Sequence, residues 1–169
     1  MSDKEEILIN DACIFFDLMD LNLLHEFFKL NFRVYTTPLV IGEITDSTQL
    51  SIISNYITDE ILVVDNNGAF EIIQEINDDH PGLSFADSSV LELAIRIKGS
   101  IISSDKALRN ESKRRNLTVR GILWIIETLL ERGIITIEIA IEKLKILPEI
   151  NQRAPLKEIS LLTKKIENK

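Results

Sequence analysis

Two acidic residues stand where a carboxylate can take part in chemistry. The apolar run Ile7–Ile9 ends at Asn10 and Asp11, and Asp105 lies two residues after the run Ser100–Ser103. The first run is apolar throughout and predicts a strand buried on both faces of a parallel sheet. Ligands bind beyond the carboxyl ends of such strands, so we expect both carboxylates at one sheet edge. Each acid by itself is also explained as the cap of the following helix.

Two further acids lie on predicted helices. Asp87 comes three residues after Ser84, so the pair fits a capping box. Leu91 nevertheless continues the row of Asp87 four residues further on. Glu43 follows Leu39 at the same spacing on a short apolar helix. We therefore expect both carboxylates on the buried sides of their helices.

Four inward carboxylates from four separate segments would repel one another. A buried charge is costly unless it is paired or binds a metal ion, and the sequence places few bases near these acids. The two histidines, His25 and His80, are far apart, and Cys13 is the one cysteine. Oxygen ligands alone favour a hard cation, Mg²⁺ or Mn²⁺. Such an ion suits phosphodiester chemistry, because it activates water and stabilises the leaving oxygen.

Strands and helices alternate along the part of the chain that must position these acids. The predicted strands are Ile7–Ile9, Val34–Thr36, Ile61–Val64, Ser100–Ser103 and Leu117–Val119. The predicted helices are Leu21–Leu30, Leu39–Ile44, Gln49–Ile57, Phe70–Ile76, Ser84–Ile97, Asp105–Arg115 and Ile122–Leu130. We expect Gly99 to stop the helix that Ser84 caps. The alternation predicts an α/β fold with a mainly parallel sheet of about five strands and helices on both faces.

The character of the sequence changes after Gly133, where strand signals end. Two apolar stripes follow, separated by a break at Asn151–Pro155: Ile137, Ala140, Ile141 and Leu144, then Leu156, Ile159, Leu162 and Ile166. They predict a C-terminal hairpin of amphipathic helices, residues 133–169, packed on a domain of residues 1–132. Packing explains the stripes first, and a groove for a second copy or another protein is the alternative.

Composition narrows the class of protein. The chain has 169 residues, of which 45% are hydrophobic and 27% charged, as in a single folded domain. It has no apolar stretch long enough for a membrane span, and with one cysteine we expect a soluble, cytoplasmic protein. The net charge of −8 argues against bulk nucleic-acid binding, but residues 96–120 carry +6. This stretch can follow a phosphate backbone or form a solvated face.

Four segments, in this order, resemble the PIN-domain ribonucleases. They are ILINDACIFFDL around Asp11, TTPLVIGEI around Glu43, LSFADSSVLELA around Asp87 and IISSDKAL around Asp105. The separation of 18 positions between the last two acids also matches that family. The resemblance extends from Ile7 to Leu130, and the C-terminal hairpin resembles extensions seen in some members.

The resemblance implies a three-layer α/β/α sandwich and metal-dependent cleavage of single-stranded RNA. It makes Asp11, Glu43, Asp87 and Asp105 the metal-binding and catalytic acids for one or two Mg²⁺ or Mn²⁺ ions. Ser103 matches a hydroxyl position two residues before the last acid and is expected to hydrogen-bond Asp11 or a metal-bound water. Many bacterial members are toxins, often dimeric, and each is inhibited by a cognate antitoxin. The resemblance therefore implies an antitoxin and a homodimer as partners.

Other residues have assigned roles or expected positions. Family members have Thr or Ser and then Asn after the first acid, where this chain has Ala12 and Cys13; we expect Cys13 to be a core residue. Lys106, Arg109 and Lys113 lie on one side of their predicted helix and are candidate RNA phosphate contacts. Asp17, Asp20 and Asp46 are expected to be exposed, and Phe15, Phe16, Phe27, Phe28 and Trp124 to lie in the core.

Two other functions remain open from the sequence. The departure at Ala12 and Cys13 is consistent with a PIN-like module that binds RNA or protein without cutting. A phosphotransfer domain of the haloacid-dehalogenase type needs a second Asp two residues after Asp11, where Cys13 stands. A Gly-rich phosphate loop is also missing after the first predicted strand.

Overall fold

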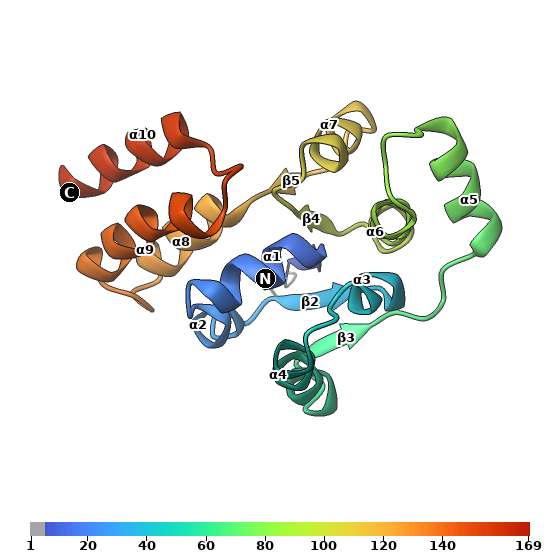
Figure 1. Ribbon diagram of the computed structural model, residues 1–169, viewed down its shortest axis with the longest axis horizontal. Helices are drawn as coiled ribbons and strands as arrows, with labels where there is room; N and C mark the ends of the chain where they lie inside the picture. Colours follow the sequence, from blue (N-terminus) through green and yellow to red (C-terminus); the bar gives the residue numbers. More distant parts are fainter. Residues whose placement is uncertain (1–5) are drawn as a thin grey trace, which may run out of the picture. The chain divides into compact units, whose positions relative to one another are not determined.

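The computed structural model describes residues 6–169 and contains a five-stranded parallel sheet with the strand order β3-β2-β1-β4-β5 (Figure 1). The strands are β1 Ile7–Asn10, β2 Arg33–Thr36, β3 Leu62–Val64, β4 Ser100–Ile102 and β5 Val119–Arg120. The chain first builds β1, β2 and β3 outward, and then returns to add β4 on the other side of β1. The strand order therefore reverses between β1 and β4, which is where α/β folds bind ligands.

The chain forms two compact units. The first consists of residues 6–14 and 32–120, and the second of residues 15–31 and 121–169. The first unit holds the whole sheet and helices α3 Pro38–Gly42, α4 Ser47–Thr58, α5 Phe70–Asp79, α6 Phe85–Ile97 and α7 Lys106–Arg114. Helix α1, Ala12–Asp20, begins in the first unit and continues in the second. The second unit also holds α2 Leu24–Phe28, α8 Ile122–Glu131, α9 Ile137–Ile150 and α10 Leu156–Glu167. The division into residues 1–132 and 133–169 stays a prediction.

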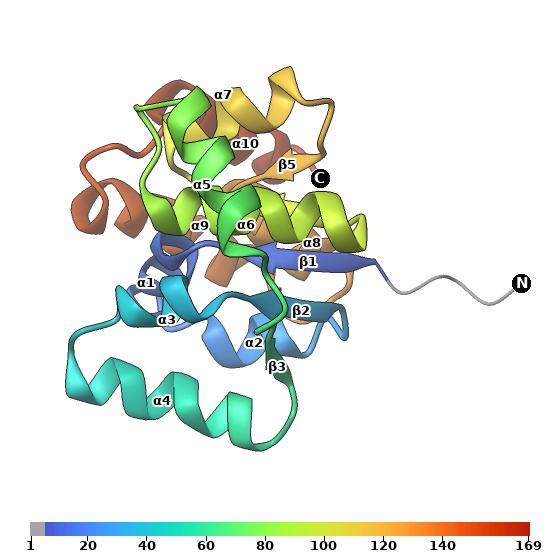
Figure 2. The same ribbon diagram turned by 90° about the vertical axis from the view of Figure 1, so that its right-hand side faces the viewer.

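In the first unit, helices α4, α6 and α7 pack on strands, and α3 and α5 pack on α6. Helix α6 contacts both β1 and β4, and α5 lies against α6, as Figure 2 shows. Helix α4 lies beside β3, and α7 beside β5. The side chains of Leu8 and Ile9 in β1 are fully buried, as expected for a central parallel strand. The predicted α/β fold with a parallel sheet flanked by helices is confirmed.

In the second unit, α8 contacts α2 and α9, and α9 contacts α10. The predicted C-terminal hairpin of α9 and α10 is therefore confirmed, although two residues of its stripes are exposed, Ile137 and Leu156. Asp17 is buried, not exposed as predicted, because the Asn151 side-chain amide donates to both of its carboxylate oxygens at 3.3 Å. None of the helices within residues 6–169 is long and apolar enough to cross a membrane.

The sequence misplaced the first helices. Helix α1 was not predicted, because its apolar run Ala12–Phe16 shows no helical period, and only Leu24–Phe28 of the predicted helix Leu21–Leu30 is helical. Of the five aromatic residues expected in the core, Phe15 and Phe27 are buried and the others half-buried. The expected positions of Asp20 and Asp46 are correct, since both are exposed.

Candidate active site

The Asp11 carboxylate is buried where the strand order reverses. The backbone N–H of Asp11 donates to the carbonyl of Ile102 at 3.1 Å, so Asp11 continues the pairing of β1 with β4. One carboxylate oxygen, Oδ1, accepts from the Ala12 backbone N–H at 2.7 Å. The other, Oδ2, accepts from the Ser103 hydroxyl at 2.8 Å and from the Cys13 thiol at 3.1 Å. These bonds hold the carboxylate in one orientation.

Ser103 connects Asp11 with the fourth acid. Its hydroxyl is fully buried, and the expected hydrogen bond to Asp11 is present. The same oxygen accepts from the Asp105 backbone N–H at 3.0 Å. Asp105 also caps α7, because its Oδ1 accepts from the Leu108 N–H at 2.9 Å. Asp105 can therefore cap α7 and also belong to the acidic cluster, because the cap uses one of its two carboxylate oxygens.

Asp87 is held by the capping box that the sequence predicted. The Ser84 hydroxyl accepts from the Asp87 N–H at 3.0 Å, and Asp87 Oδ2 accepts from the Ser84 N–H at 2.9 Å. The side chain is half-buried in the first turn of α6. Its second oxygen, Oδ1, accepts no hydrogen bond within residues 6–169. Asp87 is thus fixed by its own helix while one oxygen is left for another ligand.

The prediction that Glu43 lies on a buried helix face is wrong. Helix α3 is five residues long and ends at Gly42, so Glu43 caps its carboxyl end and is exposed. Leu39, on the same row, is also 38% exposed, whereas Val40 is buried. Within the described residues, the Glu43 carboxylate has no hydrogen bond or ion pair. It is therefore the least constrained of the four acids.

Three of the four acids, Asp11, Glu43 and Asp87, have a raised pKa. Burial raises the pKa of Asp11, and the negative charge of Asp105 raises it further. Burial raises the pKa of Asp87, with smaller contributions from Asp11 and Asp105. Although the Glu43 side chain is exposed overall, partial desolvation of its carboxylate raises its pKa, and the charges of Asp11 and Asp87 raise it further. Since none of the four forms an ion pair within residues 6–169, the cluster carries uncompensated negative charge.

Cys13 belongs to this site, contrary to its prediction as a core residue. Its sulfur lies 3.5 Å from the Ser103 hydroxyl and accepts from the Ser104 N–H at 3.3 Å. Burial raises the pKa of the Cys13 thiol to about 12, so the thiol is neutral and donates to Asp11. Its position two residues after Asp11, where the sequence departs from the pattern it otherwise resembles, was the signal in the sequence that pointed here.

The chemistry of these side chains fits a hard divalent cation. The donors are carboxylate oxygens, and their mutual repulsion is what a bound cation would relieve. Within residues 6–169, however, no three His, Cys, Asp or Glu side chains stand close enough together to hold a metal ion. The residues fit in donor type and charge, and binding requires their side chains to move closer.

The candidate RNA contacts lie on α7, which begins beside the site. Lys106 and Lys113 are exposed. Arg109 is half-buried, and its guanidinium donates to the Ser103 carbonyl at 2.8 Å. Arg109 therefore supports the backbone at Ser103, which the sequence did not indicate.

Comparisons with known proteins identify the family and the fold. The sequence model of a family described as "PIN domain" matches residues 7–167. The structure of PAE2754 from Pyrobaculum aerophilum is similar, with a TM-score of 0.52 and 14% identity over 73% of this chain and 96% of that one. A PilT N-terminus domain protein, SSO1118 from Sulfolobus solfataricus P2, gives a TM-score of 0.48 and 16% identity over 74% of this chain and 94% of that one. The comparison with curated proteins found no match. At such identities, the first structure supports the fold alone.

Proposed function

Because the chain belongs to the PIN-domain family, whose fold is generally that of a nuclease, we propose that it is an endoribonuclease that uses Mg²⁺ or Mn²⁺ to cut single-stranded RNA. One observation carries this proposal. Asp11, Glu43, Asp87 and Asp105 come from four separate segments, and their charges act on one another beside the reversal of strand order. An unpaired acidic cluster at this point is a typical place for a cation and a phosphodiester.

The chain's own residues would orient the ligands. Ser103 and the Ala12 N–H hold Asp11, Ser84 holds Asp87, and the Leu108 N–H holds Asp105. Preformed orientation matters, because ligands already in place lose little freedom when the substrate binds. When bound, a divalent cation supplies the activation of the attacking water and the stabilisation of charge on the phosphate. Lys106 and Lys113, both exposed on α7, would contact substrate phosphates beside the cluster.

The test is cleavage of mixed structured and unstructured RNA by the purified protein, with Mn²⁺ or with EDTA. We expect Asp11→Asn to lose cleavage by at least about 100-fold, because it removes one charge at the centre of the cluster. Asp20→Asn is the matched control, since Asp20 is exposed at the end of α1, outside the cluster. Thermal unfolding of both variants checks that the fold is kept. Undiminished cutting by Asp11→Asn would contradict the proposal.

A second function, binding without cleavage, is favoured by the residues beside Asp11. Cys13 supplies a weak thiol donor where family members have an amide, and Glu43 is exposed. Such a module would bind Mn²⁺ and RNA but leave every RNA intact. Turnover of RNA at catalytic protein concentrations would exclude it.

The proposal includes two partners, an antitoxin and a second copy of the chain, and both are inferred from the family resemblance. As the toxin of a toxin–antitoxin pair, the protein would slow growth when expressed alone and be neutralised by a co-expressed antitoxin. A small gene directly upstream that encodes a DNA-binding protein would support this role. Sedimentation of the purified chain would show whether it forms the homodimer that the resemblance implies.

A further inference from the structure

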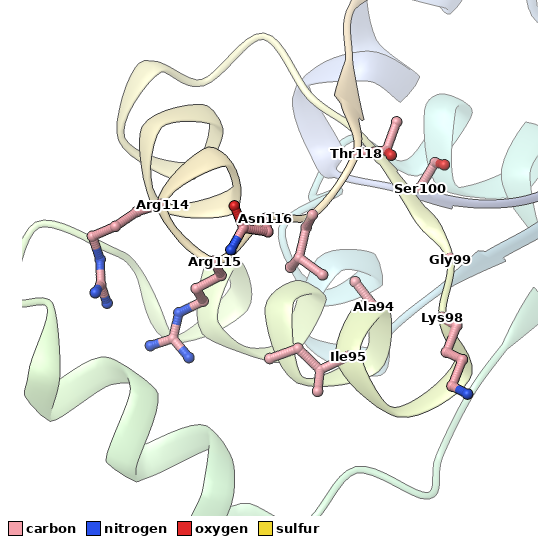
Figure 3. A pocket seen from close by; sticks show the side chains of 10 residues that line it. Ala94, Ile95, Lys98, Gly99, Ser100, Arg114, Arg115, Asn116 and Thr118 are labelled. Atoms are coloured by element: carbon pink, nitrogen blue, oxygen red, sulfur yellow. The ribbon is translucent and has the colours of Figure 1, made fainter.

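A hollow in the first unit lies at the end of the sheet opposite to the acids. Its volume is about 670 Å³, within the roughly 300–1,000 Å³ of small-ligand pockets. It is lined by the residues that join α6 to β4 and by those that join α7 to β5 (Figure 3). Ser100 begins β4 and Thr118 directly precedes β5, so the hollow meets the amino ends of these strands. The acids Asp11 and Asp105 follow the carboxyl ends of their strands instead.

The lining carries three positive charges and no acid. Lys98 comes from the end of α6, whereas Arg114 and Arg115 come from the end of α7. Figure 3 shows the Arg115 guanidinium and the Lys98 ammonium on either side of Ile95. The net charge of the whole protein is −8, so the positive lining of the hollow is a local exception.

The arginines are held in place by a buried carboxylate. Glu111 is 1% exposed and accepts from Arg114 Nε at 2.9 Å and from Arg115 Nε at 2.7 Å. The hydrogen bonds from these arginines lower the pKa of Glu111 to about 2. The terminal nitrogens of Arg115 have no hydrogen-bond partner within residues 6–169. One negative charge therefore positions two arginines and leaves donors free to bind an anion.

The backbone of Lys98 has a fixed place at the end of α6, and its exposed side chain extends from there. It ends α6 in the left-handed conformation, with φ of 57°, and Gly99 follows. A Cβ on Gly99 would come within 2.8 Å of Ile9 Cδ1, so the connection is tightly packed against β1. In the described part of the chain, the Lys98 ammonium has no ion pair or hydrogen bond. Glu6 accepts from the Ser100 hydroxyl, which lines the hollow, and pairs with Arg120.

We propose that this hollow is a phosphate-binding pocket, in which Lys98 and Arg115 grip a phosphate group from opposite sides. The set of donors matches phosphate, because guanidinium and ammonium groups make their strongest hydrogen bonds to such oxyanions. The ligand is either a phosphate of an RNA strand or a free polyphosphate. Binding of an RNA phosphate rests on the proposed ribonuclease function, whereas binding of a free polyphosphate does not depend on it.

Binding is measured in EDTA, so that no cleavage is needed, with tripolyphosphate and with a short single-stranded RNA as separate probes. Lys98→Gln removes one charge without breaking an ion pair, and Lys98→Gln combined with Arg115→Gln removes both while Arg114 still pairs with Glu111. Lys157→Gln, at an exposed lysine of α10, is the matched control. We expect about tenfold weaker binding for each lost charge-assisted contact, and no change in the control. Thermal unfolding confirms that the variants are folded.

The two probes distinguish the sources. Weaker binding of tripolyphosphate alone identifies a pocket for free polyphosphate, and weaker binding of both probes identifies a pocket that recognises the phosphate group itself. Weaker binding of RNA alone, with a smaller dependence on salt, identifies contacts to the RNA backbone. Unchanged binding of both probes by the double variant would overturn the proposal, whatever the nuclease assay shows.

Discussion

At the residue scale, the site depends on the few groups that hold Asp11. Ser103 donates to Asp11 and accepts from the Asp105 backbone, so one buried hydroxyl orients parts of two acids. Cys13 makes a weaker contact to the same carboxylate oxygen. Replacing a group that orients a metal ligand typically lowers metal affinity or activity by about 10- to 100-fold. Ser103 is therefore the best residue for testing how the cluster is positioned.

We expect Ser103→Ala to raise the Mn²⁺ concentration needed for half-maximal cleavage by about tenfold. The variant leaves Asp11 Oδ2 with the Cys13 thiol alone, and the carboxylate becomes looser. Titration of cleavage with Mn²⁺ measures the effect, and Ser160→Ala, at an exposed serine of α10, is the control. An unchanged Mn²⁺ midpoint would show that Ser103 does not orient the cluster.

At the element scale, the connection between α6 and β4 must be tight for β4 to lie beside β1. The sequence predicted that Gly99 would stop α6, but Lys98 takes the left-handed conformation instead. Gly99 is required for a different reason, which is the close approach of its backbone to Ile7 and Ile9. This pairing of β1 with β4 is what brings Asp11 to Ser103.

Gly99→Ala is therefore expected to lower the free energy of unfolding by about 1–3 kcal/mol, because the new methyl group overpacks against β1. Gly42→Ala is the matched control: a Cβ at Gly42 meets nothing within 4 Å, so stability should stay the same or rise slightly. Urea unfolding of the two variants measures the difference. Equal midpoints would mean that the strands shift to accept the methyl group.

At the scale of the whole molecule, the acidic cluster opposes folding when no cation is present. The pKa values of Asp11, Glu43 and Asp87 are raised in the folded state, so the folded protein binds protons more tightly than the unfolded chain. Their contribution to stability is therefore fully present below the ordinary values of 3.8 for Asp and 4.5 for Glu, and is lost as the pH rises through the raised values.

In EDTA, we expect the free energy of unfolding to decline more steeply between about pH 4 and pH 7 for the wild type than for Asp11→Asn. Adding Mn²⁺ at neutral pH should stabilise the wild type by about 2.7 kcal/mol at 100 times the dissociation constant. Chemical unfolding at several pH values measures both effects. This account would be contradicted if Mn²⁺ left the free energy of unfolding unchanged and if the wild type and Asp11→Asn showed parallel pH profiles.

The sequence by itself determined the local features: the buried strands, the capping box of Ser84 with Asp87, the C-terminal hairpin and the order of the four acidic segments. These follow from apolar periodicity and from hydrogen bonds between residues close in the chain. Only the tertiary structure decided that Cys13 reaches Ser103, that Glu43 is exposed and that Lys98 shares a hollow with Arg115. Such contacts depend on which strands are neighbours and where each helix ends, and those choices are set by packing across the whole sheet, which local sequence patterns do not encode.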